Sequence, residues 1–138
     1  MKRETDIRRG RHCVFLIHIH LVFVTKYRRK IFDQDTIEKL RNYFSSVCTD
    51  FDVELVEMDG ERDHVHLLVN YPPTLSVSNL VNSLKGVSSR LLRRDRPDIA
   101  ERYYYKGVLW SPSYFAASCC GAPLSIIKQY IEQQETPD

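Results

Sequence analysis

Several features are absent from this 138-residue sequence, and each absence argues against a class of protein. No apolar run approaches the roughly 20 residues that a membrane-spanning helix needs, so we expect no membrane partner. Residues 1–9 are too highly charged to form the apolar core of a signal peptide, and we therefore expect a cytoplasmic protein. A glycine-rich P-loop is also missing, which argues against a nucleotide cofactor.

Cysteine is scarce and lacks the spacing of a metal site. The four cysteines lie at positions 13, 48, 119 and 120, and no CxxC or CxH pair occurs. A structural zinc site of the usual kind is therefore not indicated. We predict that all four cysteines are reduced, partly buried small residues.

The sequence also has no large excess of positive or negative charge. The 20 basic and 18 acidic residues leave a net charge of +2, which by itself identifies no partner. The local distribution says more, because residues 26–30 hold four basic side chains in five positions. A second basic group comprises Lys85, Arg90, Arg93, Arg94 and Arg96. Such clusters with aromatic neighbours are typical of nucleic-acid-binding surfaces, although a solvated surface explains the charge equally well.

The pattern of apolar residues predicts an α+β fold. Residues 13–25 are apolar and rich in β-branched and aromatic side chains, which is typical of a strand buried on both faces. A flexible lead-in over 1–11 precedes this strand. After it we expect a helix that starts at Asp33 or Asp35, a strand over 51–58, a turn at 59–62, a strand over 64–71, a helix over 76–96 ended by Pro97, an aromatic loop over 103–107, a strand over 110–118 and a helix over 123–134.

This order is that of a ferredoxin-like, or RRM-like, β-α-β-β-α-β antiparallel sheet with helices on one face. A further C-terminal helix follows it, and one sheet face is left free for a ligand. We interpret residues 1–138 as one domain, with a core over about 12–120 and the last helix over 121–135.

Two histidine pairs have the spacing of a ligand site on a strand. Residues i and i+2 of a strand project from the same face, so His64 and His66 are expected side by side, and so are His18 and His20. Context separates the two pairs. Asp63 can orient His64, and this strand begins directly after a turn, where access is easier. The other pair lies in mid-strand between apolar residues, and we interpret it as structural.

Two imidazoles hold a divalent metal poorly without a third ligand. A zinc hydrolase would require further His, Asp or Cys residues nearby, and the apolar residues 67–69 follow instead, which argues against that function. In the C-terminal helix, Tyr130 and Gln134 are four residues apart and therefore share a face. Taken alone, Tyr130 is better explained as a boundary aromatic beside Ile126 and Ile127.

Five motifs occur in the order of a known family. They are Val24-Thr25-Lys26-Tyr27-Arg28-Arg29-Lys30, Asp63-His64-Val65-His66-Leu67-Leu68-Val69, Lys85-Gly86-Val87-Ser88-Ser89-Arg90, Trp110-Ser111-Pro112-Ser113-Tyr114-Phe115 and Tyr130-Ile131-Glu132-Gln133-Gln134. In these motifs the chain resembles the single-tyrosine HUH transposases, the IS200-like TnpA proteins of small prokaryotic insertion sequences. The resemblance covers residues 12 to 135. One departure is the stretch 117–121, where relatives are expected to have a Val-Gly-type turn.

The resemblance implies a DNA transposase that nicks and rejoins single-stranded DNA at transposon ends through a 5′-phosphotyrosine intermediate. It implies that His64 and His66 bind Mg²⁺ or Mn²⁺ with Gln134 as the third ligand, and that Tyr130 is the catalytic nucleophile. The metal would polarise the scissile phosphate. A tyrosine hydroxyl has a pKa of about 10, so it also needs an activating group that the sequence does not identify.

The resemblance also implies a homodimer, in which the tyrosine helix of one subunit can complete the histidine site of the other across residues 121–123. Whether the helix serves its own subunit or its partner stays open. The expected DNA partner is a single strand with a hairpin at each transposon end. Its contact residues are expected among Lys26, Tyr27, Arg28, Arg29, Lys30, Lys85, Ser89, Arg90, Arg93, Arg94 and Lys106.

Two other functions stay open at this point. One is a domesticated HUH relative that processes or binds DNA without mobilising an element. The other is a non-catalytic single-strand nucleic-acid-binding module with an incidental histidine pair, because many RNA-binding modules share the expected fold.

Overall fold

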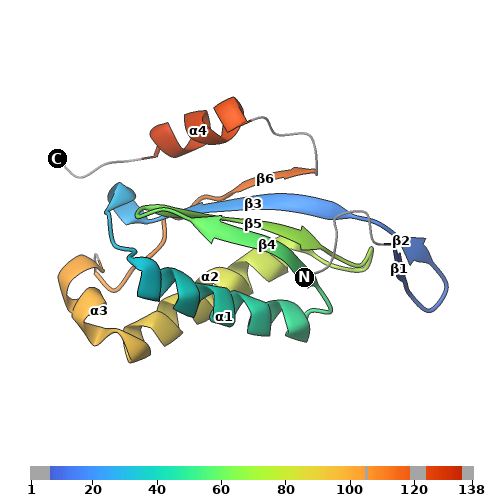
Figure 1. Ribbon diagram of the computed structural model, residues 1–138, viewed down its shortest axis with the longest axis horizontal. Helices are drawn as coiled ribbons and strands as arrows, with labels where there is room; N and C mark the ends of the chain where they lie inside the picture. Colours follow the sequence, from blue (N-terminus) through green and yellow to red (C-terminus); the bar gives the residue numbers. More distant parts are fainter. Residues whose placement is uncertain (1–6, 105, 119–123, 135–138) are drawn as a thin grey trace.

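The computed structural model describes residues 7–104, 106–118 and 124–134, whose elements are drawn in Figure 1. A short hairpin comes first, with strands β1 (Arg8–Arg9) and β2 (Val14–Phe15). The main body comprises β3 (His18–Val24), the 3-10 turn η1 (Lys26–Arg28), α1 (Gln34–Asp50), β4 (Glu54–Gly60), β5 (His64–Asn70), α2 (Val77–Asp95), α3 (Pro97–Tyr103), β6 (Phe115–Ser118) and α4 (Leu124–Glu132). No helix in these ranges is long and apolar enough to cross a membrane.

Four of these strands form one antiparallel sheet in the order β4-β5-β3-β6. Helices α1 and α2 cover one face of the sheet, and α4 lies across the other face (Figure 1). The predicted α+β fold is confirmed, with β3 in the place of the first strand and α4 as the added C-terminal helix. Because β3 and β5 are the two central strands, the histidine pair of β5 lies in the middle of the sheet.

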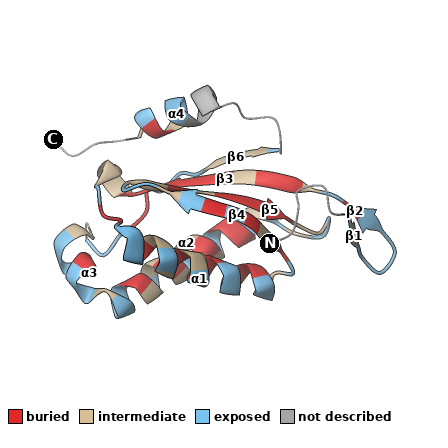
Figure 2. Ribbon diagram, viewed as in Figure 1, coloured by how far each residue is buried: buried red, intermediate tan, exposed pale blue. Residues whose placement is uncertain are grey.

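The alternation of side chains along β3 divides its residues between two cores. Ile19 and Phe23 belong to the main core, which also contains the inner faces of α1 and α2. Val22 and Val24 pack against Ile131 of α4 in a smaller second core. Figure 2 shows the buried positions along β3 and on the helices that meet the sheet. The strand is thus buried on both faces, as its unbroken apolar sequence predicts.

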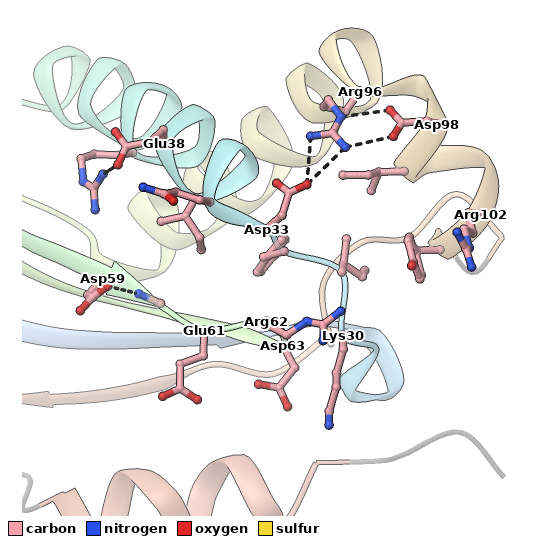
Figure 3. A pocket seen from close by; sticks show the side chains of 18 residues that line it. Lys30, Asp33, Glu38, Asp59, Glu61, Arg62, Asp63, Arg96, Asp98 and Arg102 are labelled. Carbon is pink, nitrogen blue, oxygen red and sulfur yellow. Dashed lines mark hydrogen bonds and ion pairs between the residues drawn. The ribbon is translucent and has the colours of Figure 1, made fainter.

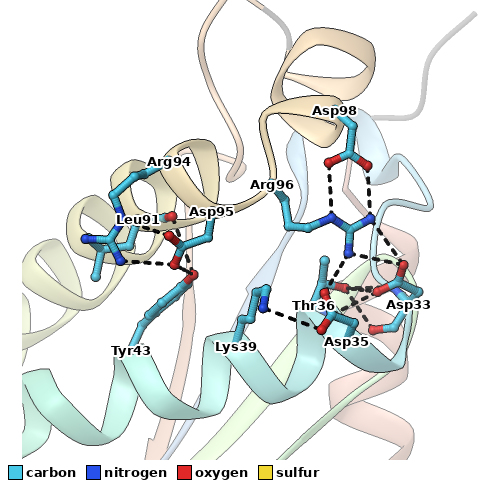
Figure 4. A network of polar contacts seen from close by, with 10 residues as sticks. All are labelled: Asp33, Asp35, Thr36, Lys39, Tyr43, Leu91, Arg94, Asp95, Arg96 and Asp98. Carbon is cyan, nitrogen blue, oxygen red and sulfur yellow. Dashed lines mark hydrogen bonds and ion pairs between the residues drawn. The ribbon is translucent and has the colours of Figure 1, made fainter.

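The start of α1 is fixed by a capping box and by an arginine from the α2–α3 junction. The Thr36 amide donates to the Asp33 carboxylate (2.8 Å), and the Asp33 amide donates to the Thr36 hydroxyl (2.7 Å). Arg96 forms ion pairs with Asp33, Asp35 and Asp98 (Figure 4). This network joins α1 to the α2–α3 junction and holds the helical layer together.

The N-terminal end differs from its prediction. Residues 7–11 do not belong to a flexible lead-in, because Arg8 and Arg9 form β1, and the Arg8 guanidinium donates to the Asn70 carbonyl at 3.0 Å. The single strand predicted over 13–25 is broken into two. Strand β2 turns away to pair with β1, whereas β3 pairs with β5 and β6.

In the second half of the chain one prediction is confirmed and another is partly wrong. Helix α2 ends before Pro97, as predicted, and Pro97 begins the short helix α3, where its fixed φ angle suits a helix start. Tyr103 is the last residue of α3, and the other described residues of the predicted aromatic loop lie outside helices and strands. The strand predicted over 110–118 is confined to β6, and Trp110 forms an isolated bridge with Thr25. Pro112 lies between the two and has no amide for a sheet hydrogen bond.

The cysteines divide by environment. Cys48 is buried, as predicted, and burial raises the pKa of its thiol to about 12. Cys13 is exposed, so the prediction of partial burial is wrong there. Positions 119 and 120, and the expected crossover at 121–123, lie outside the described residues.

Candidate active site

The histidine pair lies at the start of β5, on the sheet face toward α4. His64 and His66 are opposite Val24 and Val22 of β3, the two valines that pack against α4. The centroids of the two imidazole rings are 6.5 Å apart, and the ring planes are inclined by 28°. Both rings therefore stand side by side on one face, at the end of the strand that follows the β4–β5 turn.

Asp63 orients the first of these imidazoles. The Nδ1 atom of His64 lies 2.8 Å from Oδ1 of Asp63, so Nδ1–H donates to the carboxylate and Nε2 is the ring nitrogen that can bind a metal ion. The other carboxylate oxygen of Asp63 lies 3.7 Å from Nε of Arg28. The backbone of Asp63 is fixed as well, because its carbonyl accepts from the Thr25 amide at 2.9 Å.

The surroundings of His66 favour its neutral form. Burial lowers its pKa below the usual value, and His64 and His20 lower it further, against the opposing influence of Asp59 and Glu57. His66 is therefore neutral at neutral pH. A neutral imidazole is the form that binds a metal ion.

A cavity of about 670 Å³ lies between this sheet face and α4. The sheet and its loops contribute most of the wall, and α4 contributes Lys128, Ile131 and Glu132. The remaining lining residues are His20, Arg28, Asp59, Gly60, Glu61, Asp63, His64 and His66. The cavity thus brings cationic, acidic and imidazole groups together above the centre of the sheet.

His20 also lines the cavity, although a purely structural role was predicted for it from the sequence. In the antiparallel register, His20 is opposite Leu68 and Val22 is opposite His66, so His20 lies one diagonal step from His66 on the same face. His18 is buried, in keeping with a structural role. The register between strands is the signal that identifies His20, and it cannot be read from the spacing within one strand.

The donor set fits a divalent metal in part. With metal–imidazole bonds of about 2.1 Å, two rings that bind neighbouring positions of one ion have centroids closer together than the 6.5 Å between these two stacked rings, so the imidazoles must move toward each other to share an ion. Within the described ranges, no three His, Cys, Asp or Glu side chains are arranged to hold a metal. Two imidazoles thus stand side by side on this face, and the described residues provide no third His, Cys, Asp or Glu side chain to complete a metal site with them.

Tyr130 and Gln134 lie together, but not in the histidine cavity. The Tyr130 hydroxyl is 2.8 Å from the hydroxyl of Ser113, and Oε1 of Gln134 accepts from Ser111 (3.0 Å) and Ser113 (3.2 Å). The Tyr130 ring packs against Phe115 of β6 at 5.6 Å. The structure therefore brings the expected nucleophile and third ligand to one place, and the two histidines to another.

Helix geometry explains this separation. Successive residues of an α-helix are about 100° apart, so Tyr130 and Glu132 are on different faces of α4. Gln134 follows the end of the helix and lies beside Tyr130, because its side-chain amide donates to the Tyr130 carbonyl at 3.1 Å. Lys128 and Glu132, which are four residues apart, line the histidine cavity. In its docked position α4 thus presents its lysine and glutamate to the histidines and its tyrosine to the serines. Burial also raises the pKa of Tyr130, although the bond with Ser113 lowers it in part.

The two serines are held in place from α2. The Lys85 ammonium group crosses to this segment and donates to the carbonyl of Ser111 at 2.6 Å and to that of Ser113 at 3.0 Å. Burial lowers the pKa of Lys85 to about 8. One turn along α2, the Ser88 hydroxyl accepts from the Trp110 indole at 3.0 Å. Lys85, which was expected to contact DNA, thus stabilises the loop that contains Ser111 and Ser113 and contacts Tyr130.

The other expected DNA-contact residues do not share one surface. Arg28 lines the histidine cavity, whereas Lys30 lines a larger cavity of about 1050 Å³ that also involves α1 and α3 (Figure 3). The α2 residues lie on the opposite side of the sheet from α4 (Figure 1). There Arg93 donates to the Gly107 carbonyl at 2.6 Å, and Arg94 pairs with Asp95.

Fold and site together define a class of protein: an α+β domain whose sheet carries two histidines opposite a C-terminal helix that bears a tyrosine. Residues 13–134 match the family described as Transposase IS200 like. The chain belongs to this family, and membership supports a transposase function and DNA processing as its activity.

Individual relatives agree with this assignment. The ISDra2 transposase TnpA of Deinococcus radiodurans is 29% identical over 129 residues, which cover 94% of this chain and 91% of that protein. The transposase for insertion sequence element IS200 of Salmonella typhimurium is 30% identical over 119 residues, covering 86% of this chain and 77% of that protein.

Solved structures show the same architecture. A crystal structure from Deinococcus radiodurans R1, of a protein assigned as a transposase, superposes with a TM-score of 0.86 at 30% identity and covers 94% of this chain and 99% of its own. A REP-associated tyrosine transposase bound to a REP hairpin superposes with a TM-score of 0.57 at 13% identity, covering 91% of this chain and 68% of that one. The second likeness concerns the fold alone.

Proposed function

We propose that this chain is a metal-dependent transposase that nicks and rejoins single-stranded DNA at transposon ends through a 5′-phosphotyrosine intermediate. The observation that carries the proposal is the pair of imidazoles on one sheet face, with His64 oriented by Asp63, beneath the helix that holds Tyr130. Membership in the IS200-like transposase family supports it.

The proposed metal is Mg²⁺ or Mn²⁺, held by His64 and His66, with Gln134 as the third ligand once α4 presents it. When bound, the ion polarises the scissile phosphate and stabilises the negative charge that develops on it. Asp63 keeps Nε2 of His64 available as a ligand atom, because the carboxylate binds the proton on Nδ1. Burial keeps His66 neutral for the same role.

Tyr130 is the proposed nucleophile. Its hydroxyl gives up a proton and its oxygen forms a bond to phosphorus while the bond between phosphorus and the 3′ oxygen breaks, and the leaving 3′ oxygen takes up a proton, so that no net proton is released. The phosphodiester is exchanged for a phosphotyrosine ester, so a 3′-OH can reverse the step and rejoin strands without a nucleotide cofactor. In the docked helix the Tyr130 hydroxyl is bonded to Ser113 and does not line the histidine cavity, so this arrangement is not the one that attacks a phosphate held there.

Assembly of the site therefore requires α4 to move or to serve a second molecule. We propose a homodimer, in which Tyr130 and Gln134 of one subunit reach the histidines of the other. The proposed substrate is a single strand with a hairpin at the transposon end. The basic side chains near the histidine cavity would contact its phosphates.

The deciding experiment is detection of a covalent protein–DNA adduct on denaturing gels. The oligonucleotide carries a hairpin and is labelled at its 3′ end, because a 5′-phosphotyrosine keeps the 3′ fragment. Tyr130→Phe is expected to lose the adduct and to retain hairpin binding, and Tyr114→Phe, which alters an exposed tyrosine, is the matched control. Cleavage by Tyr130→Phe at the wild-type rate would refute the assignment, and binding without any adduct in the wild type would favour a non-catalytic DNA-binding module.

The histidine assignment has its own test. His64→Ala and His66→Ala are each expected to abolish divalent-dependent cleavage with little change in hairpin binding, whereas His18→Ala mainly lowers the stability of the fold. A mixture of Tyr130→Phe and His64→Ala subunits distinguishes the two assemblies. Recovery of activity in the mixture indicates that α4 serves the partner subunit, and its absence indicates that the helix serves its own.

A further inference from the structure

The turn that follows β3 is held in an unusual backbone conformation. Tyr27 and Arg28 are consecutive and both have a left-handed φ angle, 59° and 53°. Residues with a Cβ atom rarely adopt this conformation, because it brings Cβ close to the following carbonyl oxygen. Strain of this kind persists only where surrounding contacts impose it, and it gathers at functional sites.

Those surrounding contacts centre on Thr25. Its side chain is completely buried, and its hydroxyl donates to the Arg29 carbonyl at 2.8 Å, across the strained pair. Its carbonyl accepts from the Arg28 amide at 2.9 Å, and its amide donates to the Asp63 carbonyl at 2.9 Å. The turn is thereby fixed to Asp63, the residue that directly precedes the histidine strand β5.

The consequence is that Arg28 is aimed into the histidine cavity. Its guanidinium lies beside Asp63, with Nε 3.7 Å from one carboxylate oxygen, while the other oxygen of the same carboxylate binds His64. The Nε atom is buried, and within the described part of the chain it has no hydrogen-bond partner. Buried donors are nearly always satisfied, so a donor left over in a cavity points to an acceptor supplied by a ligand.

Arg28 differs from the other basic residues of 26–30 because it lines the histidine cavity. Nε of Arg29 is also buried without a hydrogen-bond partner among the described residues, but Arg29 does not line that cavity. The Lys26 ammonium group lies over the Tyr27 ring at 4.9 Å from its centroid, and Lys30 lines the other cavity. Arginine also suits a phosphate better than lysine does, because the planar guanidinium presents several donors to the phosphate oxygens at once. The charge pattern of residues 26–30 does not reveal which side chain faces the histidines.

We propose that Arg28 binds the phosphate that undergoes cleavage. Its guanidinium donates to a non-bridging oxygen of the scissile phosphodiester placed against His64 and His66, and its ion pair with Asp63 couples that contact to the carboxylate that orients His64. The inference rests on the proposed function, since it names the group that receives the phosphate in the same cavity.

The strain itself provides a variant that should fold. Glycine adopts a left-handed φ without penalty, so Arg28→Gly removes the guanidinium and relieves the backbone at once. We expect its thermal midpoint to equal or exceed that of the wild type. Arg28→Lys keeps the charge but loses the fork and the Nε donor. Arg9→Gln, which removes an exposed arginine on β1, is the control for net charge.

Binding is measured in EDTA with hairpin oligonucleotides, so that no metal contributes. Arg28→Gly is expected to weaken binding about tenfold, the effect of losing a charged hydrogen bond. It should also reduce the slope of log K against log salt by about 0.7, which corresponds to one phosphate contact on a single strand. Arg9→Gln should behave as the wild type does, and an intermediate affinity is expected for Arg28→Lys.

A neutral methylphosphonate at the scissile position identifies the phosphate concerned. This substitution in the DNA should lower the affinity of the wild type and change the affinity of Arg28→Gly little, because that variant has already lost the contact. Independent, multiplying effects of the two changes would overturn the proposal, and so would a coupling found only with a methylphosphonate elsewhere in the strand. If the wild type forms no adduct and no scissile position exists, the proposed function fails first, and the two failures are thus distinguishable.

Discussion

Lys85 permits a quantitative test of how the loop that receives Tyr130 is held. Its ammonium group is largely removed from water, with two carbonyl acceptors at 2.6 and 3.0 Å and the Phe23 ring 5.9 Å away. Burial lowers its pKa from 10.5 to about 8. Below pH 8 the lysine is charged in both the folded and the unfolded chain, and its burial costs stability. Above pH 10.5 it is neutral in both states and that cost is gone.

Between these limits the unfolded chain binds more protons than the folded one, so the free energy of unfolding contributed by Lys85 rises with pH. The expected rise is about 1.4 kcal/mol per pH unit, and about 3.5 kcal/mol at most over the whole interval. Part of the lysine remains in contact with solvent, which makes this total an upper limit.

The assay compares urea unfolding of the wild type and Lys85→Met from pH 7 to pH 10. Other titrating groups cancel in the difference between the two proteins, and methionine preserves most of the length of the side chain. Above pH 8, we expect the free energy of unfolding of the wild type to rise steadily relative to that of Lys85→Met. A difference that is independent of pH would refute the reasoning, because it would show that Lys85 is not buried as a charged group.

Two further predictions concern the same region. Ser88→Ala removes the acceptor of the Trp110 indole in a buried setting, and it should lower the free energy of unfolding by about 1–3 kcal/mol in urea titrations followed by tryptophan fluorescence; a loss indistinguishable from zero would contradict the hydrogen bond. Asp63→Ala should leave the protein folded and raise the divalent-ion concentration needed for half-maximal adduct formation about 10–100-fold, as measured by metal titration. An unchanged titration would show that the carboxylate does not orient His64.

Much of the fold could be predicted because its signals are local. The apolar run that contains β3 predicts a strand buried on both faces, and the structure provides a covering layer on each side. Capping chemistry predicts that α1 starts at Asp33 or Asp35, and Asp33 is the residue that caps the helix. The break between β2 and β3 was not predictable in this way, since it depends on which strand each segment pairs with.

The site was less accessible to sequence analysis, because its residues meet across strands. The spacing within β5 places His64 and His66 on one face, but His20 joins them only through the register of β3 against β5. The partners of Tyr130 could not be inferred either. Ser113 lies seventeen residues earlier in the chain, and only the docking of α4 brings the two hydroxyls within 2.8 Å.

Helix α4 packs on the sheet through the small second core, which is separate from the main core. Within the described residues this second core consists of Val22, Val24 and Ile131, with Phe115 and Tyr130 at its margin. Each such side chain contributes about 1.5–3 kcal/mol when fully buried, so detaching α4 costs a few of these increments and leaves the main core intact. The amide protons of α4 should therefore exchange through local opening, while those of β3 and β5 exchange only when the whole domain unfolds. The helix that carries the tyrosine can thus leave its own sheet as a separate cooperative unit, without unfolding the sheet that holds the histidines.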